Sequence, residues 1–165
     1  MFGTFAVYRG KKVVETEAHA WCCYVRGVDG EDISKFIKRV VFELDPSFPE
    51  PKISIETPPF EVHQVGWGQF SIGIKLFFHD PVCKPVEVFK DLILFDDSMP
   101  SSKRPIVNED YNELIFIEPS PQMFEILCQK HLVQSAANQN GEAANGSAHE
   151  SSKQDEAKEG AESEQ

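Results

Sequence analysis

Apolar and polar side chains alternate with a period of two along several stretches of the chain. The alternation is clearest over residues 19–26 and 69–78. Because successive side chains of a β-strand point to opposite faces of a sheet, each stretch predicts a half-buried strand. Shorter runs rich in β-branched and aromatic residues predict further strands at residues 5–8, 40–44, 53–55, 60–62, 86–89, 92–95 and 114–117. Seven or more short strands are typical of an all-β, antiparallel β-sandwich.

The connections between these runs are rich in residues that favour turns. Gly, Pro, Asp and Ser gather at residues 27–30, 45–51, 57–59, 66–68 and 99–102. A short C-terminal helix is predicted at residues 119–134, because Ser120 can cap free N–H groups and Pro121 suits the first helical position. Its apolar stripe would consist of Phe124, Leu127 and Cys128. Residues 33–39 fit both a helix and the start of the next strand, so their structure stays open.

The composition changes abruptly after Gln134. Residues 135–165 contain no aromatic or branched aliphatic side chain, and acids outnumber lysines there. Such a segment buries too little apolar surface to offset its ordering entropy, so we expect a disordered acidic tail. The predicted organisation is a sandwich over residues 1–118, a helix over 119–134 and a tail over 135–165. The tail would act as a solvated extension or, alternatively, as an arm that contacts a basic partner.

The charge balance favours a cationic partner. The chain has 16 Lys and Arg against 27 Asp and Glu, a net charge of −11. This charge would repel phosphate backbones and attract a basic peptide, so we expect no direct binding of nucleic acid. The cysteines at positions 22, 23, 83 and 128 lack the Cys and His spacing of a zinc site, so we expect reduced thiols, no metal and no cofactor. No apolar stretch is long enough to predict a membrane span or a secretion signal.

Two large aromatic side chains stand in predicted loops rather than in strands. Phe48 lies between Ser47 and Pro49, and Trp67 lies between two glycines. Loop aromatics either plug the core or contact a ligand, and composition alone leaves both interpretations open. The glycines beside Trp67 would let another chain approach its backbone closely.

The order of several motifs resembles the YEATS family. The similar segments are His19–Trp21, Tyr24–Gly27, Val40–Pro51, Pro58–Val62, Gly66–Phe70 and Lys75–Phe78, within a span from about residue 3 to residue 118. The Gly66-Trp67-Gly68 form is most similar to members found in histone acetyltransferase and chromatin-remodelling complexes. The resemblance implies an immunoglobulin-like sandwich whose loops at one end bind an acetylated or crotonylated lysine.

The resemblance also implies roles for particular residues. Phe48 and Trp67 would form the walls of a flat slot, while the Ser47 hydroxyl and the Trp67 backbone N–H would bind the acylated amide. The remaining expected site residues are Gly66 and Gly68 at the rim, Phe70 beneath the slot, His19 nearby, and Asp45 where many members have histidine. Residues alone leave His19 equally open to a purely structural role.

The chemistry of an acylated lysine suits this set of residues. Acylation converts an ammonium group into a neutral, planar amide with one donor and one acceptor, which one hydroxyl and one N–H satisfy. Stacking of about 0.5–1.5 kcal/mol and hydrogen bonds of similar size predict an affinity on the order of micromolar or poorer. A cage for methylated lysine is the rival, but cages surround a cation with ring faces.

The predicted function is therefore a nuclear chromatin reader rather than an enzyme. It would bind an acylated histone tail, with histone three as the expected source, and recruit subunits of a chromatin-modifying complex. His63, His79 and Asp80 have no nucleophile, metal-ligand spacing or phosphate loop near them in sequence. The alternative is a scaffold or histone-chaperone subunit that uses its acidic tail.

Overall fold

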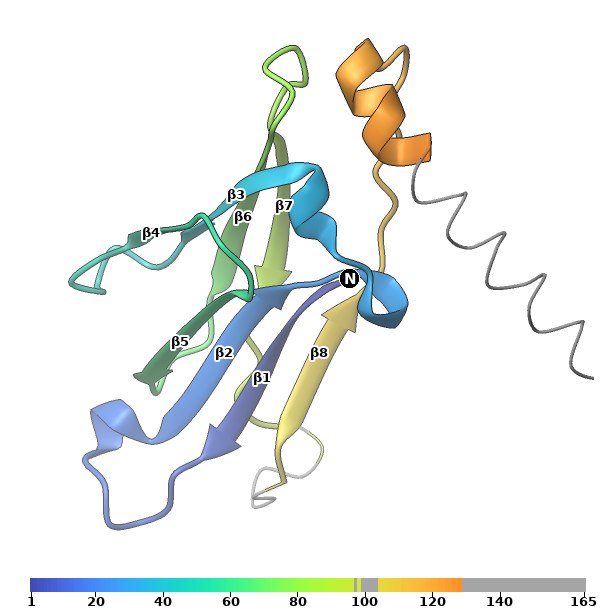
Figure 1. Ribbon diagram of the computed structural model, residues 1–165. Coiled ribbons are helices and arrows are strands. Elements are labelled where there is room, and N and C mark those ends of the chain that lie inside the picture. The colour runs from blue at the N-terminus through green and yellow to red at the C-terminus, as the bar shows by residue number, and fades with distance from the viewer. Residues whose placement is uncertain (97, 99–103, 129–165) are drawn as a thin grey trace, which may run out of the picture. The chain divides into compact units, whose positions relative to one another are not determined.

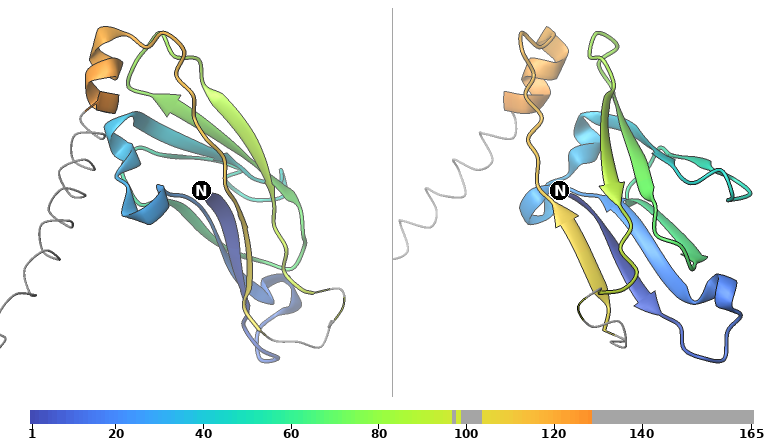
Figure 2. Two further views of the ribbon diagram at one scale, coloured as in Figure 1. Left: turned by 90° about the vertical axis from the view of Figure 1, so that its right-hand side faces the viewer. Right: turned by 180° about the vertical axis from the view of Figure 1, so that it is seen from behind.

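Two four-stranded antiparallel sheets pack face to face in the computed structural model, which describes residues 1–96, 98 and 104–128 (Figure 1). Sheet A has the order β5 (Phe60–Gly66), β2 (His19–Val25), β1 (Phe2–Tyr8) and β8 (Ile106–Asp110). Sheet B has the order β4 (Lys52–Ile55), β3 (Ile37–Glu43), β6 (Ser71–Phe78) and β7 (Val86–Asp91). Short 3-10 turns η1 (Glu15–Glu17), η2 (Val28–Gly30) and η3 (Ile33–Lys35) lie between strands. Both layers can be followed from the side and from behind in Figure 2.

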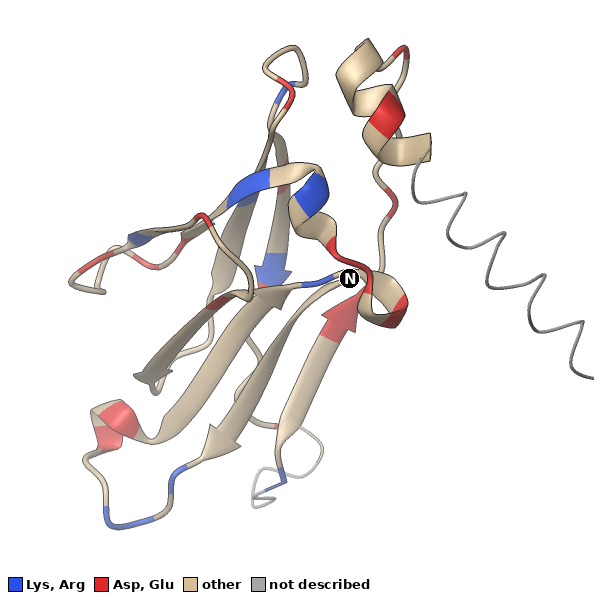
Figure 3. Ribbon diagram, viewed as in Figure 1, with Lys and Arg blue, Asp and Glu red and all other residues tan. Residues whose placement is uncertain are grey.

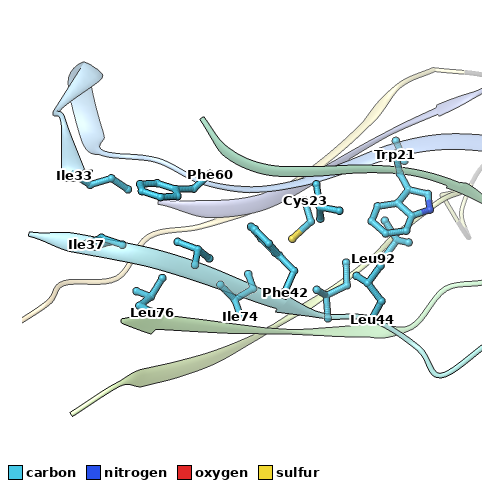
Figure 4. Packing of buried hydrophobic residues seen from close by; sticks show 14 of the residues in the cluster. Trp21, Cys23, Ile33, Ile37, Phe42, Leu44, Phe60, Ile74, Leu76 and Leu92 are labelled. Carbon is cyan, nitrogen blue, oxygen red and sulfur yellow. The ribbon is translucent and has the colours of Figure 1, made fainter. Parts of the chain in front are cut away.

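The core consists of the inward side chains of both sheets (Figure 4). Cys23 of β2 faces Phe42 of β3 across the interior, close to Ile74 of β6, and Trp21 of β2 lies beside Leu92 and Leu44. The side chains of Phe42 and Ile74 are completely buried, with 0% exposure. These residues recur at every second position, so the alternation in the sequence reports one buried face per strand.

The all-β sandwich and most of its strands were predicted correctly, but residues 92–95 were not. This stretch follows β7 without a strand partner. Leu92 and Leu94 are nevertheless buried, and their backbone N–H groups donate to Phe70 O at 2.9 Å and to the Gln69 side-chain oxygen at 2.8 Å. The apolar run therefore reflects burial of a pinned loop rather than pairing in a sheet.

The predicted strand at residues 114–117 was also wrong. The segment is irregular, with Ile115 79% and Ile117 86% exposed. Its intervening Phe116 ring contacts Phe36 and Phe78, with centroid distances of 6.2 and 5.3 Å. The Phe116 ring thus anchors this segment to the sandwich by aromatic packing. Apolar residues alternate along it as in a strand, but it pairs with no neighbouring strand.

The structure adds β8, which the sequence pattern did not indicate. Its sequence, Ile106-Val107-Asn108-Glu109-Asp110, is mostly polar because it forms the edge of sheet A beside β1. Close contact explains Gly3 of β1, since a Cβ atom there would lie 2.7 Å from Glu109 Cγ. The Tyr24 hydroxyl reaches across this position and donates to Glu109, which also pairs with Arg26 at 2.6 Å.

The structure settles the conformation of residues 33–39, which the sequence left open, and shows the first part of the predicted C-terminal helix. Ile33–Lys35 forms a 3-10 turn and β3 begins at Ile37. A helix spans residues 121–128, and Ser120 Oγ accepts the N–H of Met123 at 3.3 Å, as capping requires. The predicted stripe was partly wrong, because Met123 is buried in the core whereas Phe124 is 58% exposed.

Other predictions fall on residues outside the described part of the chain. These are the turn at residues 99–102, the helix beyond residue 128 and the acidic tail at 135–165. All four cysteines are described, and no disulfide joins them. Within the described residues, no helix is both long and apolar enough to cross a bilayer.

Replacing a core ring should destabilise the sandwich far more than replacing a surface ring. We expect Phe42→Ala to lower the free energy of unfolding by about 3–5 kcal/mol, because it leaves a cavity between the sheets. Phe89→Ala is the matched control, since Phe89 lies on β7 and is 66% exposed. Urea denaturation of both variants measures the difference, and similar losses would contradict the assigned core.

Candidate functional site

Three aromatic rings pack together at one end of the sandwich. Phe48 from the loop between β3 and β4 meets Trp21 of β2 edge to face, with centroids 5.9 Å apart. Phe70, just before β6, lies 5.6 Å from Phe48 and 5.8 Å from Trp21. Such tilted and edge-to-face contacts are the preferred geometry of aromatic pairs. The loop residue Phe48 is thereby held against Trp21 and Phe70, and these three rings are called the aromatic platform below.

Hydrogen bonds fix the loop that carries Phe48. The Asp45 carboxylate accepts the Ser47 N–H at 2.9 Å, and the Asp45 carbonyl accepts the Phe48 N–H at 3.0 Å. Pro46 suits this turn because its ring restrains the backbone. The loop closes at its base, where the Leu44 N–H donates to Pro51 O at 2.7 Å. Hydrogen bonds from the Ser47 side chain and backbone hold the pKa of Asp45 below its usual range, so Asp45 is a carboxylate at neutral pH.

Gly66 lies where the rings approach the backbone of β5. A Cβ atom at Gly66 would stand 3.4 Å from Trp21 Nε1 and 3.9 Å from the end of the Phe48 ring. A larger side chain would therefore fill the space beside both rings. No neighbouring atom lies within 4 Å of the corresponding position at Gly68, so packing alone does not demand a glycine there.

Trp67 is the exposed member of the candidate site. Its side chain is 64% exposed, and among the described residues it makes no ring contact with another aromatic. It directly follows Gly66, whereas Phe48 contacts the buried Trp21 ring and the half-buried Phe70 ring. One aromatic is thus held by the core and the other is presented to solvent.

Two buried ring nitrogens near Gly66 have no hydrogen-bond partner among the described residues. They are Trp21 Nε1 and His19 Nδ1. His19 is paired directly opposite Gly66 in the β2–β5 register, and its ring lies 5.4 Å from that of Tyr8. Burial lowers the pKa of His19 below its ordinary value of 6.5, so the ring is neutral at pH 7. Unpartnered buried polar atoms are costly, and they are found where a ligand or water completes the site.

The structure thus gathers most of the residues that the sequence singled out. Asp45, Ser47 and Phe48 share one turn, Gly66 and Phe70 lie against the Phe48 ring, and His19 is opposite Gly66. Trp67 and Gly68 continue the chain from Gly66, but no contact between the Phe48 and Trp67 rings places them as a closed pair.

Sequence reasoning missed two contributors to this end of the sandwich. Trp21 was placed only as an alternating strand residue, yet its ring joins Phe48 to Phe70. Its inward position in the alternation could have indicated this role. Gln69 was also missed, although its side chain holds the backbone of Leu94. No local sequence pattern predicts that contact, because Gln69 and Leu94 are 25 positions apart.

A different group of side chains could share a metal ion. Among the described residues these are Cys22, Glu61 and His63, whose ligand atoms all lie within 4.8 Å of one another. They come from β2 and β5, on the face of sheet A opposite to the buried Trp21 and Cys23. They are therefore separate from the aromatic platform.

Comparison with known proteins identifies the family. A model of the YEATS family matches residues 16–96. A solved Yaf9 YEATS domain bound to H3K27ac shares 34% identity with this chain, with a TM-score of 0.69 over 78% of this chain and 90% of that one. The chain belongs to the YEATS family.

Other members extend the comparison. The Yaf9 YEATS domain recognising an H3K122suc peptide is 37% identical, with a TM-score of 0.64 over 78% of this chain and 89% of that one. Transcription initiation factor TFIID subunit 14b of Arabidopsis thaliana is 44% identical over 79% of this chain and 50% of its own length. The AF-9 homolog of Schizosaccharomyces pombe is 35% identical over 72% of this chain and 58% of its own length. The chain thus spans about half of the length of these curated relatives.

The half-buried His19 of this YEATS domain should make stability depend on pH. Above pH 6.5 its ring is neutral in both states. As the pH falls through 6.5, the unfolded chain takes up a proton that the folded chain resists, so stability falls until the lowered folded pKa is passed. We expect His19→Gln to lessen this loss.

Urea unfolding at a series of pH values below 7 measures the effect. His79→Gln is the control for removing a histidine at the surface, where His79 contacts the Ser34 carbonyl at 3.0 Å. An equal change in both variants would contradict the role assigned to His19.

Proposed function

We propose that this YEATS domain binds an acylated lysine of a histone tail between Phe48 and Trp67. The observation that carries the proposal is that one of these aromatic side chains is packed against other rings while the other is exposed to solvent. Phe48 rests on Trp21 and Phe70, while Trp67 follows Gly66 and is 64% exposed. A flat acylated amide would stack on the fixed ring and gain the exposed indole as its second wall.

Polar groups at the slot match the amide. Ser47 is exposed on the turn that carries Phe48, and its backbone N–H donates to the Asp45 carboxylate at 2.9 Å. We propose that its hydroxyl donates to the same carboxylate. A hydroxyl that donates to a carboxylate keeps its lone pairs to accept the N–H of the acylated lysine. The Trp67 backbone N–H is the proposed donor to the acyl carbonyl. An unmodified ammonium would lose its water without gaining enough acceptors.

Charge near the slot favours a basic peptide. Asp45 and Glu50 are exposed in the loop between β3 and β4, where Figure 3 shows acidic positions. An Asp45 carboxylate that stays ionised would attract lysine and arginine residues flanking the modified lysine.

The relatives guide the choice of ligand and partners. Yaf9 domains are described with H3K27ac and with H3K122suc, so acylated histone H3 peptides are the proposed ligands here. Crotonyl-lysine belongs to the same chemical class, because it too carries a neutral, planar amide in place of the ammonium group. We further propose a nuclear location and membership of a transcription or chromatin-modifying complex, as the name TFIID subunit 14b indicates for one relative.

We retain the proposed organisation of a sandwich over residues 1–118, a helix over 119–134 and a tail over 135–165. In this scheme the reader function resides in the sandwich. The alternative, a scaffold or histone chaperone that acts through its acidic tail, rests on composition alone. It is separated from the reader by the first experiment below.

Loss of the exposed indole should weaken binding of the modified peptide. We expect Trp67→Ala to raise the Kd for an acetylated histone H3 peptide about ten-fold, since stacking of about 1 kcal/mol and contact area are both lost. Crotonylated peptide should lose affinity too, while the unmodified peptide binds poorly throughout. Isothermal titration of the full chain with all three peptides measures these changes.

Two controls make the result specific. Phe89→Ala removes another exposed ring, on sheet B, and should leave the affinity unchanged. A chain ending at Gln134 should still discriminate between the modified and unmodified peptides. Equal binding of these peptides, or binding lost only with the tail, would instead support the chaperone alternative.

Asp45 should act by orienting Ser47. We expect Asp45→Ala to weaken binding of the acetylated peptide several-fold, because about 1 kcal/mol is typical for one hydrogen bond. Asp45→Asn keeps a side-chain oxygen for the Ser47 N–H and should retain most of the affinity at high salt. At low salt it should bind more weakly than the wild type, because the attraction of the carboxylate for the basic peptide is lost. Tighter binding by Asp45→Ala would show that Asp45 competes with the ligand for Ser47.

A further inference from the structure

The outer face of sheet A brings together a cysteine, a histidine and a glutamate. Cys22 of β2 is paired directly opposite His63 of β5, and Glu61 precedes His63 by two residues on the same face. Cys22 is buried, with 9% exposure, although it points away from the core. The side chains of His63 and Glu61 are 68% and 36% exposed. The thiol is thus covered while the other two groups face solvent.

The spacing of the donor atoms suits a tetrahedral metal ion. Cys22 Sγ lies 3.8 Å from His63 Nε2, which lies 2.9 Å from a Glu61 carboxylate oxygen. Zinc bonds of about 2.3 Å to sulfur and about 2.0–2.2 Å to nitrogen or oxygen place tetrahedral donors about 3.3–3.6 Å apart. These two separations differ from this range by a few tenths of an ångström, and the third, between Cys22 Sγ and the Glu61 carboxylate, is within 4.8 Å. Rotation of the solvent-facing Glu61 and His63 side chains would bring the three donors to tetrahedral spacing.

We propose that Cys22, Glu61 and His63 form a zinc site with three protein ligands and one open coordination position. A thiolate and an imidazole select zinc over magnesium or calcium, which prefer oxygen ligands. The thiolate and the carboxylate together neutralise the two charges of the ion. A site with three protein ligands leaves a fourth position for water or for a donor from a bound molecule.

Occupation of the site requires loss of the thiol proton. Burial, followed by the nearby Glu61 carboxylate, raises the pKa of Cys22 to about 11, so the thiol is neutral at pH 7 in the absence of a metal ion. Zinc forms a bond to sulfur as the S–H bond breaks, and the proton leaves to solvent. His63 Nε2 donates its proton to a Glu61 carboxylate oxygen at 2.9 Å, so the two side chains lie together before the ion arrives. Zinc binding also requires this proton to move through solvent to Nδ1, which frees the Nε2 lone pair for the ion.

The surroundings leave a place for a fourth ligand. The three donors line an open groove of about 680 Å³ that also borders Phe5 and Pro59. Phe5 is paired opposite Cys22 on the β1 side, so an apolar ring borders the sulfur. Glu109 also lines the groove, but its carboxylate accepts the Tyr24 hydroxyl and pairs with Arg26. Glu61 is therefore the carboxylate grouped with the Cys22 thiol and the His63 imidazole.

Cobalt provides a direct probe, because a bond between Co²⁺ and a thiolate gives a characteristic near-ultraviolet charge-transfer absorption. The full chain should bind one equivalent of Co²⁺ with this absorption, and Zn²⁺ should displace it, whereas Mg²⁺ and Ca²⁺ should not. Cys22→Ser should abolish the absorption. His63→Gln and Glu61→Gln should each raise the Kd about ten-fold or more, because each removes one ligand.

Matched variants test whether the signal comes from this cluster. Cys83→Ser and His79→Gln remove the same residue types elsewhere and should bind Co²⁺ as the wild type does. Far-ultraviolet circular dichroism checks that each variant is folded. Should Cys22→Ser unfold, the variants at His63 and Glu61 still test the site, because both side chains face solvent and their substitution should not disturb the core. A zinc-dependent rise in Tm that is lost in His63→Gln is the second measurement. Absence of the thiolate absorption, or its retention in His63→Gln with unchanged Kd, would overturn the proposal.

Discussion

The antiparallel register between β2 and β5 fixes most of what is distinctive about this domain. That register places His19 opposite Gly66 and Cys22 opposite His63. A shift of one residue would exchange the buried and exposed faces of a strand, so burial of Trp21, Cys23, Phe60 and Val62 enforces this register. The side chains at the end of the sandwich and those on its outer face are therefore positioned by the same core contacts.

The aromatic platform extends that constraint into the loops. Trp21 lies in a regular strand and cannot move without disturbing the core, and it contacts both Phe48 and Phe70. The turn begun by Asp45 brings Phe48 to this ring, and Gly66 leaves open the space beside both rings. A ligand that meets Phe48 would thus meet a surface whose position is set before binding, which lowers the entropic cost of recognition.

The sequence was sufficient to predict the sandwich because a buried sheet face imposes a period of two. The prediction failed where a buried residue does not belong to a strand, or where a strand is not apolar. Leu92 and Leu94 are buried without a strand partner, and β8 pairs with β1 although it is mostly polar. The site divides in the same way. Phe48 and Trp67 stood out because large rings are unusual in turns, and the family resemblance gave them roles. The contacts made by Trp21 and the Cys22–His63 pair, 41 residues apart, depend on register and could not be found from spacing along the chain.

Adjacent residues of β2 belong to different sites because strand neighbours point to opposite faces. Trp21 supports the aromatic platform from inside the sandwich, whereas Cys22 faces outward beside His63. The two clusters share a backbone but no side chain. A substitution at Cys22 or His63 leaves the packing of Trp21, Phe48 and Phe70 intact, as long as the strand pairing is preserved. The outer face can therefore acquire a chemistry of its own without loss of the platform, since the core alone maintains the register on which both depend.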